Sequence, residues 1–225
     1  MYSKFLAVAL VAVIAATSLL ATPAHAVRGA DISEPFSVEA FKCAKRSGMD
    51  FLIVRCYQSF GAPDPRALES LNNAKAAGIK KRDVYHFPCR GKNPAQQVQE
   101  SMNAVGKGNF QHFYFDIETN PSPGCGWSGN LASNCKFLEE MIKAAHGEGK
   151  HVGVYASQYM WSSIMGDACH AGHDHGATLW YAHYDGSQSF SDFVPFGGWT
   201  RPSIKQYADQ FSSPCGVSAD ANWMP

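Results

Sequence analysis

Residues 110–118 have the sequence Phe-Gln-His-Phe-Tyr-Phe-Asp-Ile-Glu, in which apolar and polar side chains alternate. Side chains of a β-strand point alternately to its two faces, so Phe113, Phe115 and Ile117 share one face. The opposite face is polar throughout and consists of His112, Tyr114, Asp116 and Glu118. The alternation predicts a strand that packs on an apolar layer with one face and ends in two carboxylates on the other.

On both sides of this strand, short apolar runs alternate with longer segments of helical period from residue 27 onward. This pattern is typical of parallel strands joined by helices. We expect strands at residues 28–33, 51–57, 83–88, 110–118, 151–156, 178–184 and 203–208. Two helices are predicted to start at Asp64-Pro65 and Asn93-Pro94, where a capping side chain precedes a proline, and a third runs from Leu131 to Glu148. Because the helical period disappears after residue 185, we predict an α/β fold: a single TIM-like β/α barrel with regular early repeats and later strands that have few or no helices.

The two carboxylates fall at the strand end where parallel barrels build their active sites. The α-carbons of Asp116 and Glu118 should lie roughly 6.6 Å apart, close enough for one carboxylate to raise the pKa of the other. A protonated acid beside an ionised carboxylate is the pair that hydrolysis of a glycosidic bond requires. Asp31, at the end of the first predicted strand, adds a third acid at the same mouth. The structural alternatives are that the Asp-x-Glu pair caps the following loop and that Asp31 starts a helix.

The first 26 residues have the pattern of a secretory signal peptide. Lys4 precedes an apolar run at residues 5–16, and Ala24-His25-Ala26 forms a small-x-small cleavage site. The run is shorter than the roughly 20 residues of a membrane-spanning helix, so we expect no membrane anchor. We predict cleavage near Ala26 and one mature domain, residues 27–225, that is secreted or delivered to a lysosome or vesicle.

Charge and cysteine content limit the partners of the chain. The 19 Lys and Arg residues balance 19 Asp and Glu residues, which gives no support to nucleic-acid binding. The chain has seven cysteines, and in an oxidising compartment these predict disulfides, with at least one cysteine unpaired. Cys125 and Cys135 bracket a short loop, and we expect a local bridge between them. We also expect a monomer without a cofactor.

A set of short motifs in a fixed order resembles the Ch-type lysozymes of glycoside hydrolase family 25. The motifs are Gly29-Ala30-Asp31-Ile32-Ser33, Tyr85-His86-Phe87, Phe115-Asp116-Ile117-Glu118, Gly153-Val154-Tyr155, Leu179-Trp180-Tyr181-Ala182-His183-Tyr184, Lys205-Gln206-Tyr207 and Asp220-Ala221-Asn222. The resemblance extends over essentially the whole mature chain. It implies a flattened barrel whose later strands are irregular.

The resemblance also implies a substrate and residue roles. The substrate would be bacterial peptidoglycan, cut at the β-1,4 bond between N-acetylmuramic acid and N-acetylglucosamine. Glu118 matches the acid/base of the family, Asp116 its partner carboxylate and Asp31 its third acid. Asp220 matches a fourth acidic position, although Ala221 stands where the family usually has an aliphatic residue. Whether Asp116 attacks the sugar, stabilises an intermediate formed by the N-acetyl group of the substrate or helps to activate water stays open.

Aromatic and amide side chains near the predicted mouth are candidates for substrate binding. Trp180 and Tyr184 share a strand face with the small residue Ala182, which leaves room for a sugar ring. The full set of substrate-binding candidates is Asp220, Trp180, Tyr184, Tyr85, Tyr57 and Gln206. Aromatic residues form barrel cores as readily as binding sites, so a core role is the alternative for each tyrosine and for Trp180.

The sequence also allows two alternative functions and contains one candidate metal motif. A chitinase-like hydrolase is disfavoured because its acidic motif needs an Asp where this chain has Tyr114. A non-catalytic sugar-binding protein is disfavoured because the acids are retained. His170, His173 and His175 invite a zinc site, but the run contains glycine and lacks helical spacing, so we predict a solvated loop and no metal.

Overall fold

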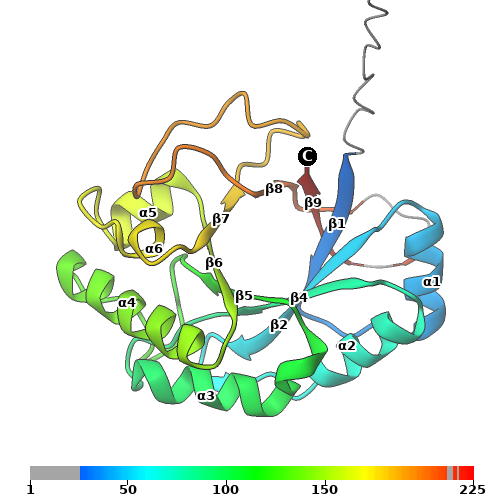
Figure 1. Ribbon diagram of the computed structural model, residues 1–225, viewed down its shortest axis with the longest axis horizontal. Helices are drawn as coiled ribbons and strands as arrows, with labels where there is room; N and C mark the ends of the chain where they lie inside the picture. The colour runs from blue at the N-terminus through cyan, green and yellow to red at the C-terminus, as the bar shows by residue number, and fades with distance from the viewer. Residues whose placement is uncertain (1–25, 212–214, 217) are drawn as a thin grey trace, which may run out of the picture.

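The structure is a computed structural model, and it describes residues 26–211, 215–216 and 218–225. The predicted signal peptide lies outside these residues, apart from Ala26. Eight of the described strands close into a barrel in the order β1-β2-β4-β5-β6-β7-β8-β9, because β1 pairs with both β2 and β9 (Figure 1). Their bounds are β1 Val27–Ile32, β2 Phe51–Gln58, β4 Lys81–His86, β5 His112–Asp116, β6 His151–Ala156, β7 Thr178–Ala182, β8 Ile204–Ala208 and β9 Asp220–Met224. The predicted TIM-like β/α barrel is therefore confirmed.

The strands β1 to β8 of the barrel run parallel, whereas β9 runs antiparallel to both of its neighbours. The seven predicted strands correspond to β1, β2 and β4 to β8, with ends shifted by a few residues. The sequence pattern missed β9 and the two-residue β3 (Ala62–Pro63), which pairs with the end of β2. In β9 the alternation is present, but Asp220 and Asn222 point at polar partners inside the barrel rather than at solvent.

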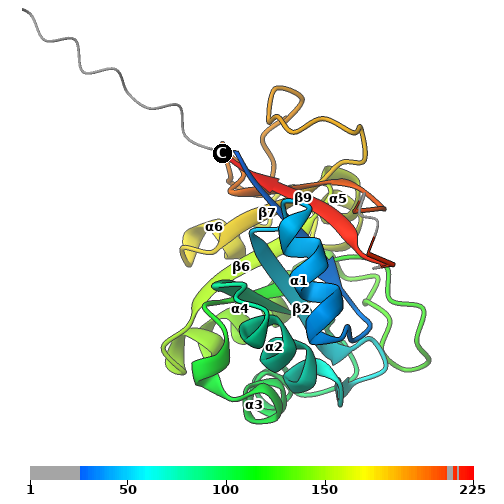
Figure 2. The same ribbon diagram turned by 90° about the vertical axis from the view of Figure 1, so that its right-hand side faces the viewer.

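Helices cover the first half of the barrel and thin out in the second, as predicted. The long helices are α1 (Val38–Arg46), α2 (Ala67–Ala76), α3 (Pro94–Val105) and α4 (Leu131–Gly147). In the described part of the chain after β6, the helices are the short α5 (Gln158–Ile164) and α6 (Ala171–Asp174), and a long loop without a helix joins β7 to β8 (Figures 1 and 2). A 3-10 turn, Lys107–Asn109, leads into β5.

Local signals explain where most helices begin and end. The Asn93 side chain accepts a hydrogen bond from the Gln96 N–H at the start of α3, and Gly106 ends that helix with a φ of 70°. The predicted start at Asp64-Pro65 was wrong, because α2 begins at Ala67. The Asp64 carboxylate accepts the Arg66 N–H at 3.0 Å in the turn before the helix, and its other oxygen accepts the Arg55 guanidinium at 2.9 Å.

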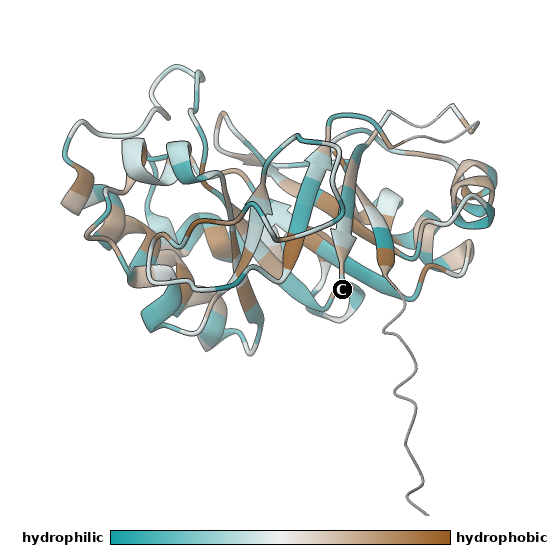
Figure 3. Cartoon of the chain, turned by 90° about the horizontal axis from the view of Figure 1, so that it is seen from above, coloured by the Kyte–Doolittle hydropathy of each residue, from teal (hydrophilic) through white to brown (hydrophobic). Residues whose placement is uncertain are grey.

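The apolar layer between barrel and helices forms the main core. Phe113, Phe115 and Ile117 are fully buried in it, on the outer face of β5. A second, smaller apolar cluster fills the barrel interior with Phe51, Ile53, Tyr114, Trp180 and Ile204. The strands in Figure 3 carry both brown and teal segments, because polar residues interrupt their apolar runs. Polar interior groups lie on both sides of this cluster, with Asp83 and His112 near the amino ends of β4 and β5 and the acids Asp31 and Asp116 near the carboxyl ends of β1 and β5.

Three disulfides join distant segments. They are Cys43–Cys215, Cys89–Cys125 and Cys135–Cys169, and Cys56 is a buried free thiol. The expected Cys125–Cys135 bridge was wrong. The loop with Cys125 folds back on the segment after β4, whereas Cys135 on α4 faces the segment between α5 and α6. The expected unpaired cysteine is confirmed as Cys56.

Among the described helices, none is both long and apolar enough to cross a membrane.

Candidate active site

Four carboxylic acids meet in one pocket at the mouth of the barrel. Asp31 lies at the carboxyl end of β1, Asp116 ends β5, and Glu118 follows two residues later. Asp220 begins β9 and pairs with Asp31, because an antiparallel strand starts where its parallel neighbours end. The pocket has a volume of about 100 Å³ and is lined by Asp31, Tyr85, Asp116, Glu118, Tyr155, Trp180, Tyr184, Gln206 and Asp220. Eight of the nine residues predicted for the site therefore come together.

Tyr57 is the exception, because the structure places it outside the pocket, and its expected role in substrate binding stays a prediction. Its side chain is fully buried outside the pocket, stacks on His86 at 4.3 Å, and donates a hydrogen bond of 2.7 Å to the Glu100 carboxylate. A β-bulge between Arg55 and Tyr57 shifts the pairing of β2 with β4. Because an extra residue reverses the alternation of faces, the bulge turns Tyr57 toward α3 and away from the barrel interior.

A chain of amides and an indole holds Asp31 in place. Asp31 Oδ1 accepts hydrogen bonds from Asn222 Nδ2 at 2.6 Å and from Gln206 Nε2 at 2.8 Å. Asn222 Oδ1 in turn accepts from the Trp180 indole N–H at 2.7 Å. Burial and the neighbouring Asp220 raise the pKa of Asp31 to about 7, against the opposing effect of the two amides. Asp31 is thus a rigid acid that exchanges its proton near neutral pH.

Gln206 uses its whole hydrogen-bonding capacity inside the protein. Its Nε2 donates to Asp31 and, at 3.0 Å, to Asp220 Oδ2. Its Oε1 accepts from the hydroxyls of Tyr155 at 2.5 Å and Tyr184 at 2.7 Å. An amide has two donors and two acceptor positions, so Gln206 orients two acids and two tyrosines in this structure.

Tyr155 and Asn222 belong to the site, although they were not among the predicted site residues. Asn222 follows Asp220 by two residues and so shares its strand face, a signal that was present in the sequence. The position of Tyr155 next to Asp116 comes from the pairing of β5 with β6, which sequence alone does not give.

Burial and mutual repulsion govern the charge of the remaining acids. The pKa of Asp116 is raised well above its usual value by burial, then by Glu118 and Asp31, while the Arg55 guanidinium opposes the shift. Burial and Asp220 raise the pKa of Glu118, and burial and Asp209 raise that of Asp220 to about 6. Four such groups cannot all be ionised in one small pocket, so the pocket retains protons near neutral pH. Proton donors and carboxylates therefore lie side by side.

The backbone at Glu118 is anchored from outside the pocket. The Trp127 indole N–H donates to the Glu118 carbonyl at 2.7 Å. Asn120 Nδ2 donates to the carbonyls of Ser59 and Pro88 at 2.8 and 2.9 Å, and the Cys89–Cys125 disulfide closes the same loop. These contacts fix the segment that presents Glu118 to the pocket.

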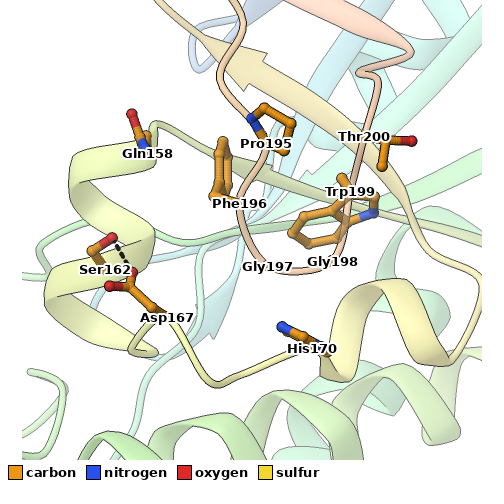
Figure 4. A pocket seen from close by; sticks show the side chains of 10 residues that line it. All are labelled: Gln158, Ser162, Asp167, His170, Pro195, Phe196, Gly197, Gly198, Trp199 and Thr200. Atoms are coloured by element: carbon orange, nitrogen blue, oxygen red, sulfur yellow. Dashed lines mark hydrogen bonds between the residues drawn. The ribbon is translucent and has the colours of Figure 1, made fainter.

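A larger hollow of about 420 Å³ lies between α5 and the 195–200 segment (Figure 4). It contains Ser162, Asp167 and His170, residue types of a nucleophilic triad. Ser162 Oγ, however, donates directly to Asp167 Oδ1 at 2.5 Å, and His170 lies across the hollow from both (Figure 4). A serine nucleophile needs a base that is itself oriented by the acid, so this arrangement does not form a triad.

The histidine-rich segment was predicted to be a loop, but it forms the short helix α6, and its imidazoles do not converge on one point. His170 lines the hollow of Figure 4, His173 Nδ1 lies 3.2 Å from its neighbour Asp174, and His175 Nε2 lies 3.1 Å from Glu139. Another group, His183, Asp185 and Asp192, does bring its ligand atoms within 4.8 Å of one another. The Lys205 ammonium bonds both of its carboxylates, at 2.9 and 2.8 Å, and so occupies the position of a cation.

A β/α barrel with a pair of acids at a strand end and two more acids beside them is the arrangement of a glycoside hydrolase. Comparison with known proteins agrees with this class. The family model described as Lysozyme-like protein 1 matches residues 22–207. "Probable GH family 25 lysozyme 2" of Dictyostelium discoideum is 43% identical over 206 residues, which cover 89% of this chain and 92% of the relative. "Lysozyme-like protein 5" of Caenorhabditis elegans is 38% identical over 202 residues, which cover 88% and 91%.

Solved structures agree on the fold. A muramidase from Acremonium alcalophilum superposes with a TM-score of 0.74 at 22% identity, covering 88% of this chain and 93% of that one. A family GH25 lysozyme from Aspergillus fumigatus gives 0.74 at 20% identity, covering 89% and 94%. The chain belongs to the lysozymes of glycoside hydrolase family 25, and it is a glycoside hydrolase.

Proposed function

We propose that this lysozyme hydrolyses the β-1,4 bond between N-acetylmuramic acid and N-acetylglucosamine in bacterial peptidoglycan. The observation that carries the proposal is the cluster of Asp31, Asp116, Glu118 and Asp220, all with raised pKa values, in one pocket at the barrel mouth. The family relationship, with relatives named as lysozymes, supports the substrate class.

Glu118 is the proposed acid/base. It is less buried than Asp116, and its raised pKa favours the protonated form that can donate to the oxygen of the bond that breaks. Asp116 is the proposed partner carboxylate. Its Oδ1 is buried and has no hydrogen-bond partner among the described residues, so no hydrogen bond to this atom stabilises its charged form. Asp31, held by Gln206 and Asn222, supplies the third acid.

The proposed location is outside the cytoplasm, in the secreted fluid or in a lysosome or vesicle. Three disulfides among the described cysteines support an oxidising compartment, together with the signal pattern of residues 1–26. We propose that the mature domain, residues 27–225, acts as a monomer and needs no cofactor.

Loss of turbidity in a suspension of bacterial cell walls tests the activity. Glu118→Gln removes the proton donor while keeping the shape of the side chain, so we expect the rate to fall by about 10²–10⁴-fold. Glu100→Gln, a change in a carboxylate outside the pocket, is the matched control and should keep the rate. An unchanged rate in Glu118→Gln would sink the assignment.

Identification of the new reducing ends separates the remaining alternatives. Ends that carry N-acetylmuramic acid support the muramidase. Cleavage of chitin oligomers in preference to peptidoglycan favours the chitinase-like alternative, which Tyr114 disfavours, since its buried ring packs edge-on against Trp180 at 5.4 Å and supplies no acid. Tight wall binding without any new ends favours a sugar-binding protein.

A further inference from the structure

The exposed apolar side chains of the described residues gather at the mouth of the barrel. They are Phe60, Leu68, Leu131, Tyr159, Tyr184 and Val194. The first five lie just after the carboxyl ends of β2, β5, β6 and β7 or in the first turn of the helix that follows. Val194 lies in the loop between β7 and β8. Because five of the six follow strand ends on the side of the acid pocket, this rim is a candidate for contact with a ligand.

Phe60 is presented by a rigid turn. Its ring is 58% exposed, at the tip of the hairpin between β2 and β3. The backbone on either side is fixed, because the Ser59 carbonyl accepts from Asn120 at 2.8 Å and the Gly61 carbonyl accepts from the Lys92 ammonium. A flat ring held on an anchored turn loses little conformational entropy when a ligand covers it.

Tyr159 is presented in a similar way by α5. Its side chain is 75% exposed in the first turn of the helix, directly after the carboxyl end of β6. Ser157 caps that turn by accepting from the Met160 N–H at 3.1 Å, and Trp161 is fully buried beneath it. The cap and the buried Trp161 therefore hold the first turn of α5 in place, while the phenol of Tyr159 faces solvent.

The two rings lie on different sides of the acids. In the closed ring of strands, β2 and β6 are separated by β4 and β5. Asp116 and Glu118 follow from β5, so a path along the rim from Phe60 to Tyr159 passes the strand end that carries the acid pair. A ligand that touches both rings must therefore be long and must extend past the pocket.

We propose that Phe60 and Tyr159 are stacking platforms for sugar rings on either side of the bond to be cut, so that the enzyme binds an extended glycan strand. The inference rests on the proposed function, since the occupant it names is the polysaccharide of that reaction. Aromatic faces suit this partner because the C–H face of a pyranose is apolar while its hydroxyls stay in water. Tyr184, which lines the pocket and is exposed, connects the pocket to the Tyr159 side.

Kinetics on long and short substrates tests the platforms. With uncrosslinked glycan strands, Phe60→Ala and Tyr159→Ala should each raise KM by about 2–10-fold, the effect of losing one aromatic contact, with kcat unchanged. A short chromogenic disaccharide that reaches only the pocket should be cut as by the wild type. Tyr159→Phe keeps the ring and should keep KM. Asp174→Asn changes an exposed side chain outside this apolar set and is the matched control.

Binding measured without turnover keeps the inference separate from the proposed function. In the Glu118→Gln background, calorimetry with the same glycan strands should show a Kd that rises several-fold when Phe60→Ala or Tyr159→Ala is added. Equal Kd values with and without the rings, or no binding at all, overturn the platforms whatever the lysis assay shows. A loss of affinity that Tyr159→Phe reproduces also overturns ring stacking, because it would assign the contact to the hydroxyl.

Discussion

Asp31 shows that this site holds a carboxylate where ionisation is unfavourable. Its side chain is only slightly exposed and lies next to Asp220, so its charged form loses hydration and meets another acid. The hydrogen bonds from Asn222 and Gln206 recover part of that loss. Such a group lowers the stability of the fold whenever it is ionised, a cost that active sites commonly carry.

Replacement of Asp31 should therefore stabilise the protein in a pH-dependent way. The pKa is about 7 in the folded protein against 3.8 for a free side chain, so below about pH 4 both states are protonated and the residue costs nothing. The cost grows as the pH rises from 4 to 7 and is complete above 7, where three pKa units correspond to at most about 4 kcal/mol. Asp31→Asn, which keeps an acceptor for both amides, should raise Tm by several degrees at pH 8 and hardly at pH 4.

Thermal unfolding at the two pH values measures this difference. Asp174→Asn, at an exposed position, is the control and should change Tm little at either pH. An equal gain for Asp31→Asn at pH 4 and pH 8 would contradict an origin in buried charge. The variant should also lose activity, since Asp31 is one of the proposed catalytic acids.

Residue-level prediction succeeded where alternation continues without interruption. The run that ends in Asp116 and Glu118 keeps its two-residue period, so the sequence alone predicts that both side chains point to the mouth of the barrel. The same alternation predicts that Tyr57 points into the barrel, but the bulge between Arg55 and Tyr57 turns its side chain to the other face. A bulge depends on how the strand pairs with its partner, which the sequence of one strand does not show. Disulfide partners likewise depend on which loops meet in space, as Cys89 and Cys125 do.

At the scale of elements, one buried lysine organises the segment that replaces the missing helices. The Lys205 side chain on β8 is fully buried, and its ammonium bonds Asp185, Asp192 and the Ser189 carbonyl. The two carboxylates come from the loop between β7 and β8, which also contains Tyr184. A single cation thus ties a loop without secondary structure to the barrel wall.

Removing the two sides of this ion pair should have unequal effects. The double variant Asp185→Asn with Asp192→Asn leaves a fully buried ammonium without an anion, which should cost about 3–5 kcal/mol of unfolding free energy. Lys205→Met removes the buried charge and leaves two partly exposed carboxylates, so its cost should be smaller. Urea unfolding measures both, and the triple variant should recover most of the loss. A Lys205→Met cost equal to or above that of the double variant would refute this account.

The elements that sequence analysis found are those with a strong period and clear caps. The helices α3 and α4 begin at capping asparagines, Asn93 and Asn130, and the parallel strands are apolar enough to stand out. The strand β9 was missed because its inward residues Asp220 and Asn222 are polar. Its role depends on Asp31 and Gln206, which lie far away in sequence.

At the scale of the whole molecule, the barrel is closed by its first and last strands, β1 and β9. The Cys43–Cys215 disulfide spans 172 residues and joins α1 to the segment before β9. A crosslink across so long a stretch restricts the unfolded chain more than a local one does. It also holds the antiparallel strand that carries Asp220 next to the rest of the ring.

Removal of this crosslink should cost more than removal of a shorter one. Chain-entropy arguments give about 5 kcal/mol for Cys43→Ser with Cys215→Ser and about 4 kcal/mol for Cys89→Ser with Cys125→Ser. Denaturant unfolding of the two double variants under oxidising conditions measures the order. A larger loss from the Cys89 and Cys125 pair would show that the anchored loop at Glu118, and not the unfolded chain, dominates the effect.

The pairing of β1 with β9 also determines which side of the molecule can be tethered. Val27, the first residue of β1, pairs with Met224, the last residue of β9, so both ends of the domain emerge at the end of the barrel away from the acids. An anchor, a fluorescent reporter or an additional wall-binding module fused at Met224 would lie on the side of the barrel opposite the acid pocket. It would therefore leave the mouth of the barrel accessible. Immobilisation through this end would therefore turn the catalytic face outward, toward a surface as large and rigid as a cell wall.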